Sequence, residues 1–284
     1  MKIIKTPHEM QAQVEAWRLA GHTVGFVPTM GALHAGHLSL VNRARGHNDK
    51  TVVSIFVNPT QFRPGEDFQQ YPRPFERDCE LLQGEQCDVV FAPEATAMYH
   101  GDTRAFVDVE GVSLRWEAEA RPGHFRGVAT VVAKLFNLVR AHHAYFGEKD
   151  FQQLKVIEAM VRGLNFEIEI VPCPTVREDD GLALSSRNAY LTPQQRAAAP
   201  VIYRALKTAR EKAHNGYYDV SDLTAAIHGV LQTEAILEPE YAAIVDDETL
   251  EPLEWLTDTT SARAIIAVRA GNTRLIDNLA ISVR

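Results

Sequence analysis

The chain has 284 residues, of which 45% are hydrophobic, and its formal net charge is −8 at pH 7. This acidity argues against a broad nucleic-acid or anionic-membrane surface, because such partners are held by clustered lysine and arginine side chains. The three cysteines lack a Cys-x-x-Cys spacing, and no apolar run is long enough for an export signal or a membrane span. We therefore expect a soluble protein of the reducing cytoplasm.

Over residues 1–175, short β-rich runs alternate with helical patterns, as in βαβ units built on a parallel sheet. The expected strands are 23–27, 51–57, 88–92, 144–146 and 166–171, and the expected helices are 7–20, 38–44, 76–86, 128–139 and 150–164. The pattern over residues 1–175 therefore predicts an α/β domain.

The pattern changes after Cys173-Pro174, where a polar loop over 177–188 marks a domain boundary. Thr192-Pro193-Gln194-Gln195 combines an N-cap threonine with a proline at the first helical position, which predicts a helix over 193–214. A second helix is expected over 221–237, followed by strands at 241–245, 264–268 and 275–276. Residues 176–284 thus predict a smaller α+β domain.

The tetrapeptide His34-Ala35-Gly36-His37 follows the strand at 23–27 and the turn Pro28-Thr29-Met30-Gly31, and it opens a helix. Histidines three residues apart face the same way, and the first amides of a helix favour an anion. Taken alone, two capping or solvated histidines explain these residues equally well. Their place at the end of a parallel strand, where such sheets bind ligands, favours a phosphate site.

The segment Gly147-Glu148-Lys149-Asp150 lies between another strand and a helix. Asp150 fits an N-cap, and the same carboxylate can accept hydrogen bonds from ribose hydroxyls, while Lys149 offers a point charge to phosphate. Gln152 and Gln153 lie in the first turn of the helix, from which an amide could reach a ligand.

Leu184-Ser185-Ser186-Arg187-Asn188 offers two hydroxyls, a guanidinium and an amide within one loop. Hydroxyl-rich loops are common, so a purely structural role is favoured on local grounds, although the arginine suits a polyphosphate. Asn58-Pro59-Thr60-Gln61-Phe62 reads equally well as a plain turn and as a contact for a hydroxylated substrate.

Two acidic runs, Glu178-Asp179-Asp180 and Asp246-Asp247, lack histidine or cysteine partners. We interpret both as solvated loops and expect no metal ligand from the protein.

Together with Phe56–Phe62 and Arg-Pro-Gly-His-Phe-Arg-Gly-Val at 121–128, these motifs resemble the pantothenate synthetase family, in order and over nearly the whole chain. The resemblance implies an ATP-dependent ligase that joins pantoate to β-alanine through a pantoyl adenylate and releases AMP and pyrophosphate. It also implies a Rossmann-like domain at 1–175 that binds ATP and pantoate, a C-terminal lid domain at 176–284, a magnesium requirement and a homodimer.

Carried over by position, the resemblance implies that His34 and His37 contact the ATP phosphates and stabilise the charge that develops on the α-phosphate. It also implies that Lys149 and Arg187 are further catalytic cations. The ATP-binding residues that it implies are Met30, Gly36, Gly147, Lys149, Asp150, Val176, Leu184, Ser185, Ser186 and Arg187. The pantoate-binding residues that it implies are Asn58, Gln61 and Gln153. The loop departs from the Lys-Met-Ser-Lys-Ser pattern of related tRNA synthetases at Ala183, Ser186 and Arg187.

Two other functions share part of this pattern. A nucleotidyltransferase acting on a small phosphorylated acceptor would use the same His-x-Gly-His chemistry. A nucleic-acid-binding module descended from a tRNA synthetase is disfavoured by the net acidity and by the absence of a basic helix.

Overall fold

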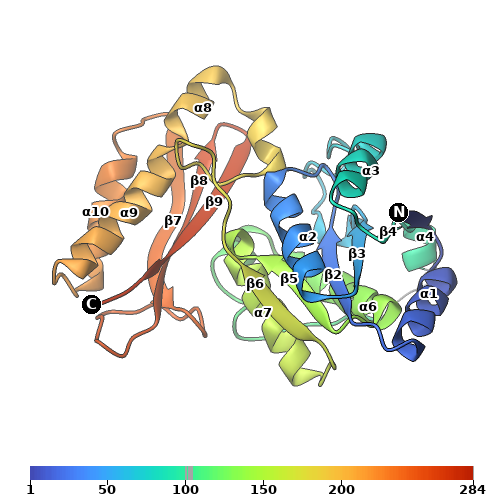
Figure 1. Cartoon of the computed structure of the whole chain (residues 1–284). Coiled ribbons are helices and arrows are strands. Elements are labelled where there is room, and N and C mark those ends of the chain that lie inside the picture. Colours follow the sequence, from blue (N-terminus) through green and yellow to red (C-terminus); the bar gives the residue numbers. More distant parts are fainter. Residues whose placement is uncertain (100, 102–104, 284) are drawn as a thin grey trace. The chain divides into compact units, whose positions relative to one another are not determined.

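A computed structural model describes residues 1–99, 101 and 105–283. The chain divides into two compact units (Figure 1). The first comprises Met1–Gly147 with Gln152–Pro174, and the second comprises Glu148–Phe151 with Thr175–Arg284. The second unit therefore takes four residues from the middle of the first.

The first unit is built on a parallel sheet with the strand order β1-β4-β3-β2-β5-β6. Its strands are β1 (Lys2–Ile4), β2 (Val24–Thr29), β3 (Lys50–Ile55), β4 (Val89–Phe91), β5 (His143–Gly147) and β6 (Glu169–Cys173). The Rossmann-like α/β class expected from the sequence is confirmed.

Alternating side chains of the central strand face two different helix layers. Val27 lies in a buried cluster with Val41 and Ala44 of α2 (Ala35–His47), whereas the ring of Phe26 packs edge-on against Phe136 of α6 (His124–Val139), with centroids 6.4 Å apart. Each face of β2 is thus covered by apolar residues, as a parallel strand requires. The other helices of this unit are α1 (Pro7–Leu19), α3 (Phe75–Gly84), α4 (Ala95–Met98), α5 (Glu117–Ala120), α7 (Phe151–Gly163, of which Phe151 belongs to the second unit) and the 3-10 turn η1 (Pro59–Gln61).

The strand order reverses between β2 and β5. From β2 the chain builds outward through β3 and β4, and it then returns to the opposite side of β2 to form β5 and β6. The carboxyl ends of strands at such a switch point are the usual ligand site of open α/β sheets. Met30 and Gly147 lie directly at these two ends.

The second unit pairs an antiparallel sheet with two long helices. The strands β7 (Leu237–Asp246), β8 (Ala262–Ala270) and β9 (Thr273–Ile281) follow in order, and α9 (Val201–His214) and α10 (Val220–Leu231) pack on them through a common apolar cluster (Figure 1). The shorter elements of this unit are η2 (Glu148–Asp150), η3 (Ser186–Tyr190) and α8 (Pro193–Ala198). The expected small α+β domain is confirmed.

Several elements differ from the sequence expectation. The helix expected over 193–214 is split into α8 and α9, because Pro200 has no amide hydrogen to donate to the preceding turn. α10 ends at Leu231, and Leu237 instead opens β7. β1 was not expected, since three residues are too few to show a period. Within the described residues, no helix combines the length and the apolar character needed to cross a membrane.

Candidate active site

The turn after β2 is fixed by a buried carboxylate from α3. Asp78, 1% exposed, accepts hydrogen bonds from the amides of Ala32 at 2.8 Å and Leu33 at 2.8 Å. Gly31 and Ala32 have φ values of +81° and +52°, and a Cβ on Gly31 would lie 2.9 Å from Asp78 Oδ2. Burial raises the pKa of Asp78, although the two amides oppose that rise. The sequence analysis missed this residue, because its partners lie 46 and 45 positions away.

His34 and His37 close the N-terminus of α2 as a capping pair. The amide of Gly36 donates to Nδ1 of His34 at 3.2 Å, and the amide of His34 donates to Nδ1 of His37 at 3.4 Å. The two rings lie 4.1 Å apart. Because each Nδ1 accepts a hydrogen bond, the proton of a neutral ring sits on Nε2. Both of the interpretations left open by the sequence therefore share one geometry: the histidines cap the helix with one nitrogen and keep an N–H donor on the other.

Asn58 and Gln61 form one buried hydrogen-bonded group around η1. Asn58 is 1% exposed, and its Nδ2 donates to Gln61 Oε1 at 3.1 Å and to the Gly127 carbonyl at 3.2 Å. Its Oδ1 accepts from the Tyr99 hydroxyl at 2.8 Å. Gln61 Nε2 lies 3.1 Å from the Met30 sulfur, which links η1 to the turn after β2. The Asn58 side chain is thus engaged in holding Gln61 in place, and its own amide is bound within the protein.

The backbone of Gln61 is held by two residues of the 121–128 motif. Nδ1 of His124 lies 3.0 Å from the Gln61 carbonyl, and its Nε2 lies 3.1 Å from a nitrogen of Arg121. A guanidinium only donates, so Nε2 accepts and the ring proton sits on Nδ1. Burial, with a smaller contribution from the Arg121 charge, lowers the pKa of His124 to about 4. Arg121 is itself paired with Glu66 at 2.9 Å and with Glu117 at 3.8 Å.

Gly127 allows this contact between α6 and η1. A Cβ at this position would lie 2.4 Å from the Thr60 carbonyl oxygen and 2.8 Å from Cα of Gln61. The sequence motif at 121–128 gave a family resemblance but no role. The structure shows that its histidine, arginine and glycine all serve the placement of Gln61.

Gln152 and Gln153, which the sequence presents as equivalent, belong to the first unit at the start of α7. Gln152 donates to the carbonyls of Val112 at 2.8 Å and Arg115 at 2.9 Å, and it accepts from the Glu117 amide at 3.1 Å. Its amide therefore holds a surface loop. Of the two glutamines, Gln153 remains the substrate-binding candidate.

In the second unit, the loop expected over 177–188 is partly ordered as a hairpin. Arg177 and Ala183 form an antiparallel bridge, and the Leu184 amide donates to the Val176 carbonyl at 3.0 Å. These contacts place two of the predicted ATP-binding residues side by side. Ser185 caps η3 by accepting from the Arg187 amide at 3.3 Å.

The acidic runs lie in partly exposed loops, as expected, but three of their carboxylates are ion-paired, which the sequence did not predict. Arg196 of α8 reaches Asp180 at 2.6 Å and Glu178 at 2.6 Å, and its hydrogen bond lowers the pKa of Asp180. Asp247 pairs with Arg263 at 2.6 Å. The sequence could not show this, because each arginine partner lies 16 or 18 residues away.

The predicted residues fall into two sets, one in each unit. The first unit holds Met30, His34, Gly36, His37, Asn58, Gln61, Gly147 and Gln153, and the second holds Lys149, Asp150, Val176, Leu184, Ser185, Ser186 and Arg187. Lys149 and Asp150 lie 3.5 Å apart at their charged atoms. Across residues 1–99, 101 and 105–283, no three histidine, cysteine, aspartate or glutamate side chains are grouped as a metal site requires.

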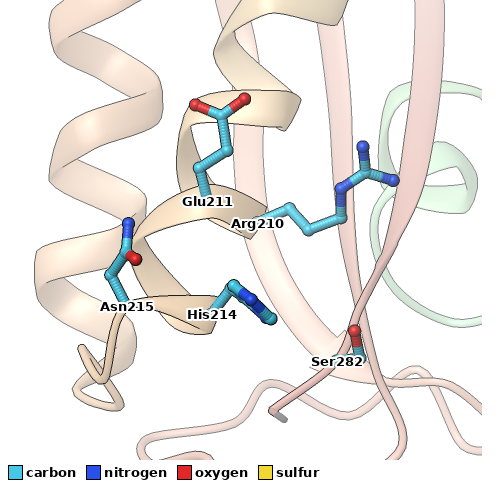
Figure 2. A pocket seen from close by; sticks show the side chains of 5 residues that line it. All are labelled: Arg210, Glu211, His214, Asn215 and Ser282. Atoms are coloured by element: carbon cyan, nitrogen blue, oxygen red, sulfur yellow. The ribbon is translucent and has the colours of Figure 1, made fainter.

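A separate hollow of about 390 Å³ lies in the second unit. Figure 2 shows its lining: Arg210, Glu211 and His214 of α9, the C-cap residue Asn215, and Ser282, which follows β9. It contains none of the residues that the sequence singles out.

The comparisons with known proteins agree over the whole length. The family model for pantoate-beta-alanine ligase matches residues 2–280. Pantothenate synthetase of Rubrobacter xylanophilus is 54% identical over 98% of both chains, and that of Thermotoga neapolitana is 51% identical over 98% of this chain and 99% of its own.

Solved structures give the same result. Pantothenate synthetase from Thermus thermophilus superposes with a TM-score of 0.94 at 50% identity, covering 99% of this chain and 100% of that one. Pantoate-beta-alanine ligase from Francisella tularensis, described as complexed with beta-gamma ATP and beta-alanine, gives a TM-score of 0.81 at 33% identity over 99% and 97% of the two chains. The chain belongs to the pantoate–β-alanine ligase family.

Proposed function

We propose that this chain condenses pantoate with β-alanine at the expense of ATP, through a pantoyl adenylate, and releases AMP and pyrophosphate. The observation that carries the proposal is the family match over residues 2–280. The Francisella relative, described as a complex with beta-gamma ATP and beta-alanine, supports the choice of two of the substrates.

ATP is needed because a carboxylate is a poor electrophile. In the first step an oxygen of the pantoate carboxylate attacks the α-phosphorus, the bond from that phosphorus to the oxygen bridging to the β-phosphate breaks, and pyrophosphate leaves with the electron pair. The protein's task is to align the two groups and to stabilise the negative charge on the phosphorus oxygens. No protein nucleophile takes part.

His34 and His37 suit this task because of how they cap α2. Each ring accepts a backbone hydrogen bond at Nδ1, so each keeps its proton on Nε2 as a donor. Two such donors beside a helix N-terminus place positive potential at the end of β2 without a charged residue. We assign them to the α-phosphate, with Lys149, Arg187, Ser185 and Ser186 on the remaining phosphate oxygens and Asp150 on the ribose.

Pantoate is assigned to Gln61 and Gln153. The Gln61 side chain and carbonyl are both fixed by buried partners, so the residue is held in place before substrate arrives. A neutral amide also suits a substrate whose carboxylate must remain nucleophilic.

In the second step the neutral amine of β-alanine attacks the acyl carbon. The acyl–phosphate bond breaks, AMP leaves, and the amine loses a proton to give the amide. Water would hydrolyse the same mixed anhydride, so we assign residues 176–284 the role of a lid over a domain at 1–175 that binds ATP and pantoate.

A homodimer, a cytoplasmic location and a need for Mg²⁺ complete the proposal. No three ligating side chains of the described residues are grouped, whereas Mg²⁺ bound to nucleotides is held largely by phosphate oxygens and water. We therefore assign Mg²⁺ to the ATP phosphates and route no step through a protein-bound ion. Light scattering of the purified protein would test the dimer.

The decisive assay is exchange of labelled pyrophosphate into ATP. Exchange that requires pantoate, with AMP and amide formed only after β-alanine is added, supports the ligase. A nucleotidyltransferase would instead leave the nucleotide on a phosphorylated acceptor, and pantoate-independent exchange would contradict our proposal. Filter binding of tRNA at low salt tests the third function, for which we expect no retention.

A further inference from the structure

Lys149 and Asp150 follow β5 of the first unit directly along the chain, yet they pack with the second unit. The segment Glu148–Phe151 groups with residues 175–284, while Gly147 before it and Gln152 after it belong to the first unit. Lys149, which we assign to the ATP phosphates, therefore belongs to the second unit, although it follows a strand of the first unit's sheet in sequence. The contacts within the second unit show what holds it there.

The side chain of Asn278 on β9 binds this segment through its backbone. Asn278 is 4% exposed, and its Nδ2 donates to the carbonyl of Glu148 at 2.8 Å and to that of Lys149 at 3.1 Å. An amide nitrogen carries two hydrogens, so one side chain satisfies two consecutive peptide carbonyls. This fixes the peptide groups on both sides of Lys149.

Arg263 of β8 prevents the Asn278 amide from turning over. Its guanidinium donates to Asn278 Oδ1 at 2.7 Å, and a guanidinium has no acceptor, so the oxygen of the amide must face it. Arg263 is 7% exposed, lies 3.6 Å above the centroid of the Phe151 ring, and pairs with Asp247 at 2.6 Å. The segment is thus held at its beginning by Asn278 and at its end by Arg263.

The neighbouring residue on β9 anchors the other predicted ATP-binding segment. Asp277 binds Arg177 through both oxygens, at 2.6 Å and 2.9 Å, and it accepts the amide of Asn278 at 2.7 Å. Arg177 belongs to the hairpin that joins Val176 to Leu184. Two adjacent residues of one strand therefore support two segments that are far apart in the sequence.

We propose that Asn278 is a positioning residue for Lys149, and that Asp277-Asn278 makes the C-terminal sheet the frame on which the phosphate-binding groups are placed. This rests on the proposed function, which assigns Lys149 to ATP. Asn278 is 4% exposed, and its side-chain oxygen and nitrogen are bound to Arg263, Glu148 and Lys149, so we expect its effect to pass through Lys149.

The test is Asn278→Asp. The aspartate keeps the size of the side chain and an oxygen for Arg263, but it turns an acceptor toward two carbonyls. We expect the KM for ATP to rise about tenfold, which corresponds to about 1.4 kcal/mol, while the KM for pantoate changes less than twofold. A uniform loss of kcat with both KM values unchanged would overturn the proposal.

A double-mutant cycle separates positioning from general damage. If Asn278 acts through Lys149, then Lys149→Ala combined with Asn278→Asp has the same KM for ATP as Lys149→Ala alone. Multiplying effects would overturn the proposal. If the aspartate variant does not fold, the cycle is repeated with Asn278→Ser. This substitution removes the two hydrogen bonds that the side-chain amide donates and adds no charge.

Hydrogen exchange gives a readout that does not depend on activity. Faster exchange in a peptide covering 148–152, with β8 and the rest of β9 unchanged, supports the anchoring, and unchanged exchange there contradicts it. Asn215→Asp is the matched control, because it makes the same chemical change at an exposed position of the same unit and should alter neither exchange nor the KM for ATP. If the wild type lacks pantoate-dependent ATP turnover, the proposed function is wrong. The hydrogen-exchange measurement then still tests whether Asn278 anchors residues 148–152.

Discussion

The two units hold their shares of the candidate site by different interactions. In the first unit, the parts around Gln61 and the His34 turn are fixed mainly by buried hydrogen bonds from neutral groups and backbone amides, namely Asn58, His124, Tyr99 and the amides bound to Asp78. In the second unit, arginine–carboxylate pairs fix most of the corresponding segments, namely Arg177–Asp277, Arg196–Glu178, Arg196–Asp180 and Arg263–Asp247, while the Asn278 amide holds the backbone of Glu148 and Lys149.

The difference teaches where each unit is vulnerable. A buried histidine that stays neutral costs stability as the pH falls below the ordinary histidine pKa of 6.5, because the unfolded chain then binds a proton that the folded protein does not. An arginine–carboxylate pair fails only when the carboxylate is protonated, at lower pH, and where it is exposed it is weakened by salt. The Arg196–Asp180 pair should therefore persist to lower pH than the His124 contact, because Arg196 lowers the pKa of Asp180, whereas burial raises the pKa of Asp277 against the opposing effect of Arg177.

The largest expected effect is the acid response of the first unit. The pKa of His124 is lowered to about 4 in the folded protein, against 6.5 for the free side chain. The stabilisation is present above pH 6.5 and is lost as the pH falls toward 4, by about 3 kcal/mol at 1.36 kcal/mol per pKa unit. His124→Asn keeps a donor for the Gln61 carbonyl but cannot titrate there. Urea unfolding at pH 7 and at pH 4.5 should show a smaller loss for the variant, and equal losses would contradict this role.

The next effect concerns chemistry at the end of β2. His37→Ala removes one Nε2–H donor, and by analogy with the loss of one oxyanion donor we expect the first step to slow about a hundredfold. Single-turnover adenylation measures it, and a rate close to that of the wild type would remove His37 from the mechanism. Lys149→Ala, in the second unit, should mainly weaken ATP binding or turnover.

A smaller effect is expected where a charge does serve the first unit. Asp78→Asn leaves one acceptor for two amides and turns an N–H₂ group toward the other. We expect the free energy of unfolding to fall by about 2 kcal/mol, the typical cost of one unsatisfied buried group. Chemical denaturation measures the loss, and Asp88→Asn, at a more exposed carboxylate of the same unit, is a suitable comparison. A stability equal to that of the wild type would show that the turn does not need the carboxylate.

The smallest effect belongs to the ion pairs of the hairpin. Arg196→Gln removes two pairs whose side chains are about a third exposed, so we expect a loss of about 0.5–1 kcal/mol at low salt. The Arg196 hydrogen bond lowers the pKa of Asp180, so this contribution is present above the ordinary aspartate range and lost below it. Thermal melts in about 0.05 M and about 1 M salt should converge for wild type and variant, because the higher concentration screens exposed charges. If the stability difference between wild type and Arg196→Gln is the same at both salt concentrations, exposed ion pairs do not distinguish the second unit from the first.

Much of the fold could be predicted because the period of apolar residues is a local property. The strands at β2 to β6 and the amphipathic helices carry it, and the split at Pro200 needed only attention to the missing amide hydrogen. The supports of the site could not be predicted in the same way. Asp78 and His124 act on residues 45 to 63 positions away; the sequence around Asp78 does not distinguish it from an ordinary helix carboxylate, and the 121–128 motif that contains His124 gave a family resemblance but no role.

The same limit explains why the ion pairs of the acidic runs were not predicted. Glu178, Asp180 and Asp247 sit in loop-like sequence, and only the fold brings Arg196 and Arg263 to them. Candidate ligand residues were easier to identify than their supports, because they cluster after strand ends in short motifs. Whether each binds the assigned group is what the kinetic experiments above decide.

The histidine pair that closes α2 separates folding from chemistry. A helix start of this kind is ordinarily closed by a serine or threonine and, three positions later, a glutamate or glutamine. Replacing His34 and His37 by that ordinary pair would preserve the cap and remove both imidazoles. On the proposed role of the two imidazoles, we expect such a variant to fold but to be inactive, which would suit it to trapping intact substrates for crystallography. It also follows that selection for stability alone has no reason to keep histidine at these two places, so their retention in a lineage would record demand for the product.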